Sequence, residues 1–231
     1  MALGRTCSFG CVLYVLVSGV SCSHKPAPHA ATERLAEALS RRDAVSALSA
    51  IDKGARVMEI TNLSRPSLEL AVETGSLDLV KRLLQSGADI NVKGEHGEDL
   101  LQTAAAAGYP DICAFLIAEG LNPNATNVLG NALTISILSG HYAASKVLLS
   151  AGAKPDVPTV LGKTPLHGAC FLGRMDLVEL LITNGANVSI TDRFGHTPLF
   201  TAERRGFSNV VEYLSQQTKG SFDPERLQKK P

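Results

Sequence analysis

One short pattern, an apolar stretch closed by a glycine, recurs along this 231-residue chain at a nearly fixed period. The closing glycines are separated by 33, 32, 33 and 33 residues, and a second glycine series runs in phase with them. The two series are Gly75, Gly108, Gly140, Gly173 and Gly206, and Gly54, Gly87, Gly120, Gly152 and Gly185. Such a period is typical of repeat proteins, in which each unit buries its apolar face against its neighbours. The sequence therefore predicts a solenoid that offers a binding surface and no enclosed reaction chamber.

The clearest copy of the repeat occupies residues 162–187 and contains the signals of two helices. Pro165 follows a threonine and can open the first helix, because the missing N–H of a proline is not needed in the first turn. Gly173 ends that helix, and residues 175–182 then place apolar side chains at helical spacing. Gly185 can supply a left-handed C-terminal cap. Each unit is therefore expected to be a helix–turn–helix followed by an extended finger.

This copy resembles the ankyrin repeat, which opens on Thr-Pro-Leu-His and closes on Gly-Ala-Asp-Val-Asn. Here the opening begins at Thr164 and the close begins at Gly185. The resemblance covers residues 32–215 and implies an all-α solenoid of about five repeats, preceded by a degenerate cap unit at residues 32–57. The unit at 131–156 is one residue short before its first closing glycine, which leaves the geometry of its first turn open.

Four segments are predicted from these patterns. They are a leader at residues 1–22, a flexible tether at 23–31, the repeat domain at 32–217 and a polar tail at 218–231. In the leader, an apolar run from Cys11 to Val20 is too short for a membrane span, which needs about 20 residues. A short apolar run with a basic residue before it and small residues after it is the plan of a secretory signal.

The end of this leader is similar to a bacterial lipobox, in which Cys22 would become the lipidated first residue of the mature chain. Gly19 departs from that motif, so simple cleavage near Ser23 and an uncleaved segment are the alternatives. The resemblance implies an exported bacterial ankyrin-repeat lipoprotein in the periplasm or outer membrane. Lipidation of Cys22 would give it a membrane anchor.

Composition and motifs exclude several functions. Net charge is zero and tryptophan is absent, whereas nucleic-acid binding needs a basic face or a stacking platform. The sequence contains no Gly-x-Ser-x-Gly, no phosphate-binding loop and no helical histidine pair with a carboxylate. Cys113 and Cys170 fall in apolar columns of the repeats and are expected to be buried. We therefore expect no catalytic residues, metal, cofactor or small-molecule substrate.

Several surface positions are apolar where an ankyrin unit normally carries polar residues. They lie at the finger tips and near the end of the first helix of each unit, with arginines at the C-terminal edge. A contiguous exposed apolar patch typically marks an interaction site, although the tips could instead simply pack on one another. The predicted partner-binding residues are Val128, Leu129, Leu138, Val160, Leu161, Phe171, Leu172, Arg193, Phe194, Arg204 and Arg205.

Two functions fit this pattern, and both use a second protein as the partner. The first is a non-catalytic binding module in the bacterial cell envelope that serves as an inhibitor or immunity partner of an envelope or effector enzyme. The alternative is a structural or stress-protective periplasmic support protein, for example in peroxide defence. Both need only a rigid binding face, so the sequence does not separate them.

Overall fold

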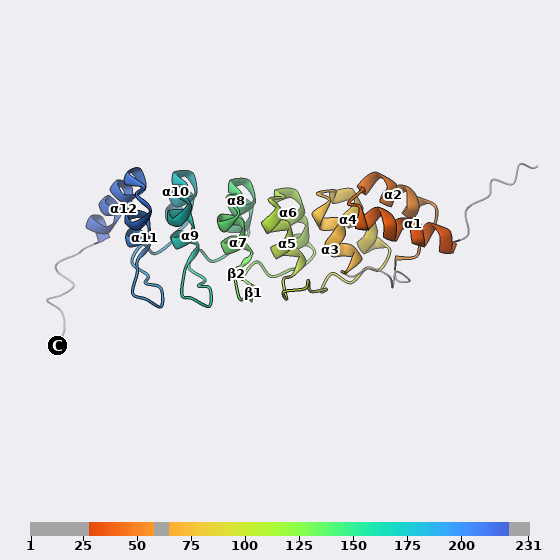
Figure 1. The fold of residues 1–231 in the computed structure, drawn as a ribbon, viewed down its shortest axis with the longest axis horizontal. Helices are drawn as coiled ribbons and strands as arrows, with labels where there is room; N and C mark the ends of the chain where they lie inside the picture. The colour runs from red at the N-terminus through yellow and green to blue at the C-terminus, as the bar shows by residue number, and fades with distance from the viewer. Residues whose placement is uncertain (1–27, 58–64, 222–231) are drawn as a thin grey trace, which may run out of the picture.

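A computed structural model describes residues 28–57 and 65–221 (Figure 1). Within these ranges the chain forms six helix pairs that stand side by side in a row, with extended fingers projecting from one edge of the row. The helices are α1 (Pro28–Ser40), α2 (Ala44–Asp52), α3 (Ser67–Glu73), α4 (Leu77–Gln85), α5 (Leu100–Ala107), α6 (Pro110–Ala118), α7 (Ala132–Leu138), α8 (Tyr142–Ser150), α9 (Pro165–Leu172), α10 (Met175–Thr183), α11 (Pro198–Arg205) and α12 (Ser208–Ser221). The predicted all-α solenoid is confirmed.

Local sequence signals explain where the first helix of a unit begins. Asp99 caps α5 by accepting the backbone N–H of Gln102, and the Gln102 side chain accepts the N–H of Asp99 in return. Thr164 and His167 form the same reciprocal arrangement at the start of α9, where Pro165 occupies the first turn. Such capping satisfies backbone donors that would otherwise lack partners at a helix start.

The glycine that closes the first helix of a unit meets a side chain from the next unit. Gly173 has φ of 68°, a left-handed conformation that favours glycine, and a Cβ there would lie 2.5 Å from Cδ1 of Phe207. Gly108 has φ of 77°, and its Cβ would lie 2.5 Å from Nδ1 of His141. The glycine period therefore reflects both backbone conformation and close packing between successive units.

A continuous apolar core runs along the row from Leu35 to Leu214. Cys113 and Cys170 are fully buried in it as free thiols, as the sequence predicted. Each helix pair therefore buries its apolar residues against the pairs beside it, as expected of a solenoid. No helix in the described ranges is both long enough and apolar enough to cross a membrane.

The N-terminal unit corrects one predicted boundary. Helix α1 begins at Pro28, so residues 28–31 belong to the first helix and not to the tether predicted at 23–31. Proline is favoured in a first helical turn, and Ala31 is fully buried, which ties this segment to the core. The leader predicted at residues 1–22, with Cys22, lies outside the described residues.

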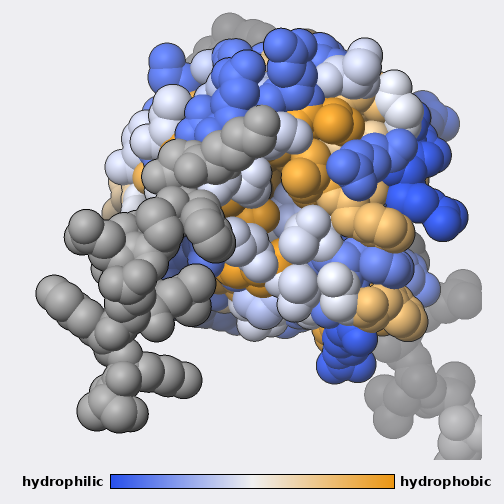
Figure 2. Space-filling view, turned by 90° about the vertical axis from the view of Figure 1, so that its left-hand side faces the viewer, coloured by the Kyte–Doolittle hydropathy of each residue, from blue (hydrophilic) through white to orange (hydrophobic). Residues whose placement is uncertain are grey.

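The C-terminal end also differs from the predicted boundary, because α12 continues to Ser221 and not only to residue 217. No further helix pair follows α12 among the described residues, so Leu199, Val211 and Tyr213 remain half-buried. Figure 2 views this end of the row and shows apolar surface interleaved with polar side chains. The last unit is therefore less completely covered than the units inside the row.

The short unit at 131–156 keeps a complete first helix. Asn131 caps α7 by accepting the N–H of Thr134 at 3.0 Å. The missing residue falls in the finger before this cap, where β1 (Thr126–Asn127) and β2 (Gly130–Asn131) pair as a tight antiparallel hairpin. The shortening therefore changes the finger tip and leaves the helix pair intact.

Candidate functional site

An apolar groove opens between two finger tips and the helices behind them. It has a volume of about 300 Å³ and lies over α7 and α9, near the middle of the row. Polar and small residues complete its lining, among them Thr159, Lys163 and Thr201. Six of the predicted partner-binding residues form its apolar walls: Val128, Leu129, Leu138, Val160, Leu161 and Phe171. The structure thus brings together residues that are more than 40 positions apart in the sequence.

Backbone geometry places these side chains around the groove. Val128 and Leu129 form the two-residue tip between β1 and β2. The next finger closes through a hydrogen bond from the N–H of Thr159 to the carbonyl oxygen of Lys163 at 2.9 Å, so that Val160 and Leu161 lie at its tip. Gly168 lets α9 pack closely against Leu138, since a Cβ there would lie 3.0 Å from Cδ2 of Leu138.

The apolar walls remain exposed to solvent. The exposed fractions range from 44% at Leu138 to 58% at Val128, so contact between neighbouring tips does not bury these side chains. A monomeric protein rarely leaves a contiguous apolar patch uncovered unless the patch binds something. The groove is therefore a strong candidate for the interaction site.

The other predicted residues lie outside the groove lining. Phe194 is 68% exposed at the tip of the next finger, and Leu172 is half-buried at the end of α9. Arg205 stacks on the ring of Phe171, with its guanidinium 4.3 Å from the ring centroid, and donates Nε to the Phe171 carbonyl oxygen at 3.2 Å. Arg204 lies 6.0 Å from the ring centroid of Phe200.

The arginines form a basic edge beside the groove. Arg193, Arg204 and Arg205 are exposed, and no ion pair to a carboxylate holds any of them within the part of the chain that the structure describes. Arginine stacked on an aromatic ring keeps its remaining N–H donors available to a ligand. This edge can therefore receive carboxylates from a partner.

His167 lines the groove and links two segments around it by hydrogen bonds. Its Nδ1 accepts the backbone N–H of Thr164 at 3.1 Å, which leaves the proton on Nε2, and Nε2–H donates to the carbonyl oxygen of His196 at 3.0 Å. Burial lowers the pKa of the His167 imidazole. The neutral ring therefore ties the finger at His196 to the start of α9.

A second depression, of about 490 Å³, lies beside the groove toward the N-terminal end. Val128 and Leu129 line both, so one finger tip separates them. Its polar side chains come from three different units, and the sequence analysis did not predict that they lie close together. They are Arg42, Arg65, Glu73, His96, Glu98, Gln102, Thr103 and Asn127.

Ion pairs in this depression join the first two units. Arg65 donates to Glu69 and, at 2.7 Å, to Glu73. Arg42, which adopts φ of 56° where later units have glycine, lies 2.9 Å from the other oxygen of Glu73. The Arg65–Glu69–Glu73 spacing of four residues was the sequence signal for one half of this arrangement.

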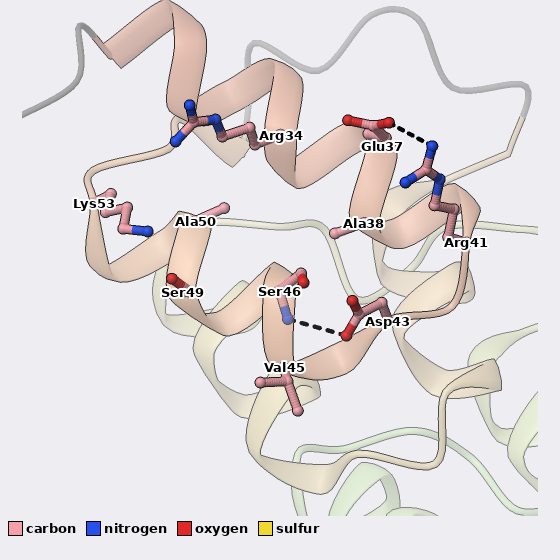
Figure 3. A pocket seen from close by; sticks show the side chains of 10 residues that line it. All are labelled: Arg34, Glu37, Ala38, Arg41, Asp43, Val45, Ser46, Ser49, Ala50 and Lys53. Carbon is pink, nitrogen blue, oxygen red and sulfur yellow. Dashed lines mark hydrogen bonds and ion pairs between the residues drawn. The ribbon is translucent and has the colours of Figure 1, made fainter.

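A third depression, of about 400 Å³, lies on the outer side of the first helix pair (Figure 3). Its acidic groups already have partners within the unit, since Glu37 pairs with Arg41 at 2.8 Å and Asp43 caps α2 through the N–H of Ser46. Hydrogen bonds from the side chain and then the backbone of Ser46 lower the pKa of the Asp43 carboxyl group. We therefore assign this depression to the structure of the cap unit.

The described residues were compared with what a metal site or a cysteine nucleophile requires. No group of three or more His, Cys, Asp or Glu side chains is arranged there to hold a metal ion. Burial raises the pKa of the Cys113 and Cys170 thiols to about 12, so neither supplies a thiolate near neutral pH.

Comparisons with known proteins agree with this architecture. A family model described as ankyrin repeats (3 copies) matches residues 68–159 and 155–225. Ankyrin repeat and KH domain-containing protein mask-1 of Caenorhabditis elegans is 33% identical over 156 residues, which are 66% of this chain and 6% of that protein. Cyclin-dependent kinase inhibitor 2A of Monodelphis domestica is 35% identical over 121 residues, 52% of this chain and 70% of that protein.

A bacterial relative is also found. Phosphocholine transferase AnkX of Legionella pneumophila is 26% identical over 149 residues, which are 62% of this chain and 16% of that protein. The chain thus spans only a small part of AnkX and of mask-1. With the family model matched over most of its length and the helix pairs described above, this chain belongs to the ankyrin-repeat family.

Proposed function

We propose that this chain is a non-catalytic module that binds another protein through the apolar groove between its central finger tips. The observation that carries the proposal is the set of six apolar side chains that wall one groove and remain 44–58% exposed. Ankyrin repeats are protein-interaction modules, and the described residues contain no cluster arranged for metal chemistry.

The apolar groove and the arginines at its edge are arranged like the hot spot of a protein–protein interface. A few anchoring side chains in a water-excluding pocket carry most of the energy of such an interface, with polar groups around them. Phe171 is the central anchor here, because it lines the groove and also carries the stacked Arg205. A partner that inserts an apolar side chain and presents a carboxylate to this edge would satisfy both features.

We further propose that the partner is an enzyme that this chain inhibits. Cyclin-dependent kinase inhibitor 2A and, from rat, cyclin-dependent kinase 4 inhibitor B (32% identical over 120 residues) are by name inhibitors of an enzyme. The second of these is matched over 92% of its length by the repeats of this chain. An inhibitor or immunity protein that covers a partner's surface needs only the rigid face described above.

The location that we propose is the bacterial cell envelope. Support comes from the short apolar run at residues 11–20 and from Cys22 after it. Two or more acyl chains on Cys22 would give durable anchoring, since each buried methylene contributes about 0.8 kcal/mol. Cys22→Ser should then release the protein from membrane fractions, and unchanged membrane partition would contradict the proposed anchor.

A comparative pull-down tests the binding site. Tagged wild-type protein is compared with Leu138→Lys and Phe171→Ala by quantitative mass spectrometry, with Val45→Lys as the control. Val45 is 78% exposed and lies in the first unit, far along the row from the groove. We expect one partner to be lost from both groove variants and kept by the control. Equal recovery with all four proteins would contradict the proposed site.

A further inference from the structure

In two units, the third residue of the first helix ties that helix to the finger of the next unit. In α5, Gln102 donates Nε2–H to the carbonyl oxygen of Gly130 at 3.1 Å. In α9, His167 donates in the same way to the next finger, as described above. The third residue of α7 is Thr134, whose short side chain donates Oγ1–H to Oδ1 of Asn131 at 2.9 Å, within its own unit. Among the described residues, no such side-chain tie therefore joins α7 to the finger that follows it.

The finger after α7 keeps one acceptor position open at its base. The carbonyl oxygen of His196 accepts two hydrogen bonds, one from its own finger at 2.9 Å and one from His167 at 3.0 Å. At the equivalent position, the carbonyl oxygen of Lys163 accepts the N–H of Thr159 at 2.9 Å and no second donor within residues 65–221. A carbonyl oxygen has two lone pairs. Because Thr134 and Lys163 both line the groove, the groove lies where the missing side chain would stand.

The backbone also leaves the two fingers that border the groove unjoined. The last two fingers are joined, because the N–H of Arg193 donates to the carbonyl oxygen of Leu161 at 3.1 Å. A Cβ at Gly162 would lie 3.0 Å from the backbone nitrogen of Arg193, so these two fingers are in backbone contact. The equivalent hydrogen bond, from Val160 to Leu129, is absent from the described part of the chain. The groove therefore opens where the side-chain tie and the backbone hydrogen bond are both missing.

The charge of the lining limits which side chain can complete this site. The groove is lined by Lys163 and by no aspartate or glutamate, and Arg205 lies at its edge on the ring of Phe171. A cationic side chain would meet like charges there, and a carboxylate has no hydrogen to donate to a carbonyl oxygen. Tyrosine and tryptophan combine a large apolar ring, which suits the apolar walls, with a neutral O–H or N–H donor.

From these observations we infer that the partner inserts a tyrosine or tryptophan whose ring donor bonds to the carbonyl oxygen of Lys163, and that Thr134 determines this specificity. The inserted ring takes the place that the side chains of Gln102 and His167 hold in the neighbouring units. This inference rests on the proposed function and adds the identity of the inserted residue. The carboxylate that the basic edge receives belongs to the same partner segment.

Selection from a random library of 12-residue peptides, displayed on phage, tests the inference without knowledge of the natural partner. Wild-type protein should enrich peptides that contain a tyrosine or a tryptophan. One enriched peptide is then synthesised with this residue intact or replaced by a ring without the donor, phenylalanine for tyrosine and naphthylalanine for tryptophan. Both forms are titrated by fluorescence anisotropy. Loss of the donor should weaken binding to the wild type about two- to tenfold, the range for one hydrogen bond.

Variants at Thr134 test the protein side of the same contact. Thr134→Gln gives α7 the side chain that α5 carries, which should occupy the groove itself and weaken the peptide about tenfold or more, as expected for a central contact. Thr134→His, which copies α9, is the second variant and should act in the same way. Thr134→Val is the matched control, because it keeps the shape of threonine and should leave the groove open. Urea denaturation of each variant confirms that it is folded.

Two outcomes would overturn the inference: enriched peptides that bind equally well without a ring donor, or folded Thr134→Gln and Thr134→His proteins that bind as tightly as the wild type. Failure of the proposed function has a different signature. If Leu138→Lys binds the selected peptides as tightly as the wild type, the apolar groove is not the binding site, whatever the ring donor does. If no peptide is enriched at all, both the proposed function and this inference are contradicted.

Discussion

Replacing Gly173 with alanine should destabilise the array by more than the same change at Gly206. Both glycines close the first helix of a unit in the left-handed conformation, with φ of 68° and 77°. An L-residue in this conformation costs about 1–2 kcal/mol, and both variants carry that cost. The two sites differ in their neighbours, since no atom lies within 4 Å of a Cβ at Gly206, whereas one at Gly173 meets Phe207 at 2.5 Å.

The steric difference sets the expected magnitude. Overpacking by one methyl group typically costs about 1–3 kcal/mol, so Gly173→Ala should lose about 2–5 kcal/mol in all and Gly206→Ala about 1–2 kcal/mol. Phe207 is half-buried and packs against the core, so its ring cannot move away without losing contacts. Removing the ring in Phe207→Ala should bring the cost of Gly173→Ala down to the level seen at Gly206.

Urea denaturation followed by far-UV circular dichroism measures these free energies of unfolding. Terminal units of a solenoid can unfold before the rest, so amide exchange in α11 and α12 should be followed as well. Equal losses for Gly173→Ala and Gly206→Ala would refute the reasoning. So would a cost of Gly173→Ala that persists undiminished in the Phe207→Ala background.

Three further predictions concern the core and its titratable groups. Leu181→Ala should cost about 2–5 kcal/mol in the same denaturation assay, because Leu181 is fully buried on α10 and its truncation leaves a cavity. The pKa of His167 is lowered in the folded state, so the unfolded state binds the proton more readily and stability should fall as pH drops below about 6.5; His167→Gln should flatten this slope between pH 7 and 5. Cys113 and Cys170, with pKa values raised to about 12, should react with Ellman's reagent at pH 8 only as fast as the array opens, and rapid labelling of native protein would contradict their burial.

The fold could be predicted from the sequence because each unit repeats the same local signals. The glycine series marks where helices end, and the threonine–proline pair at Thr164 marks where one begins. The start of α1 could not be placed, since residues 23–31 lack periodicity and only tertiary contact shows that Ala31 is buried. The tight hairpin before α7 also depends on backbone pairing that the shortened unit did not specify.

The apolar groove could be predicted from the sequence, whereas the second depression beside it could not. The apolar groove followed from aligning the units, because equivalent positions such as Leu138 and Phe171 stack in neighbouring repeats. The second depression, beside the groove, was missed, since its polar residues occupy different positions in three units. Arg42 reaches Glu73 from a left-handed turn that the 33-residue spacing to Gly75 indicates, although arginine itself does not favour that conformation. Leu172 was grouped with the groove but lies outside its lining.

Site-specific photo-crosslinking in the native cell tests most directly whether the groove binds a protein. A photoreactive phenylalanine analogue is placed at Leu161 in the groove wall and, as the control, at Val45 on the first unit; both positions are exposed. We predict a discrete protein adduct from Leu161 that is absent from Val45 and that disappears when Leu138→Lys is added. The absence of any adduct at Leu161, or the same adducts from both positions, would contradict the account.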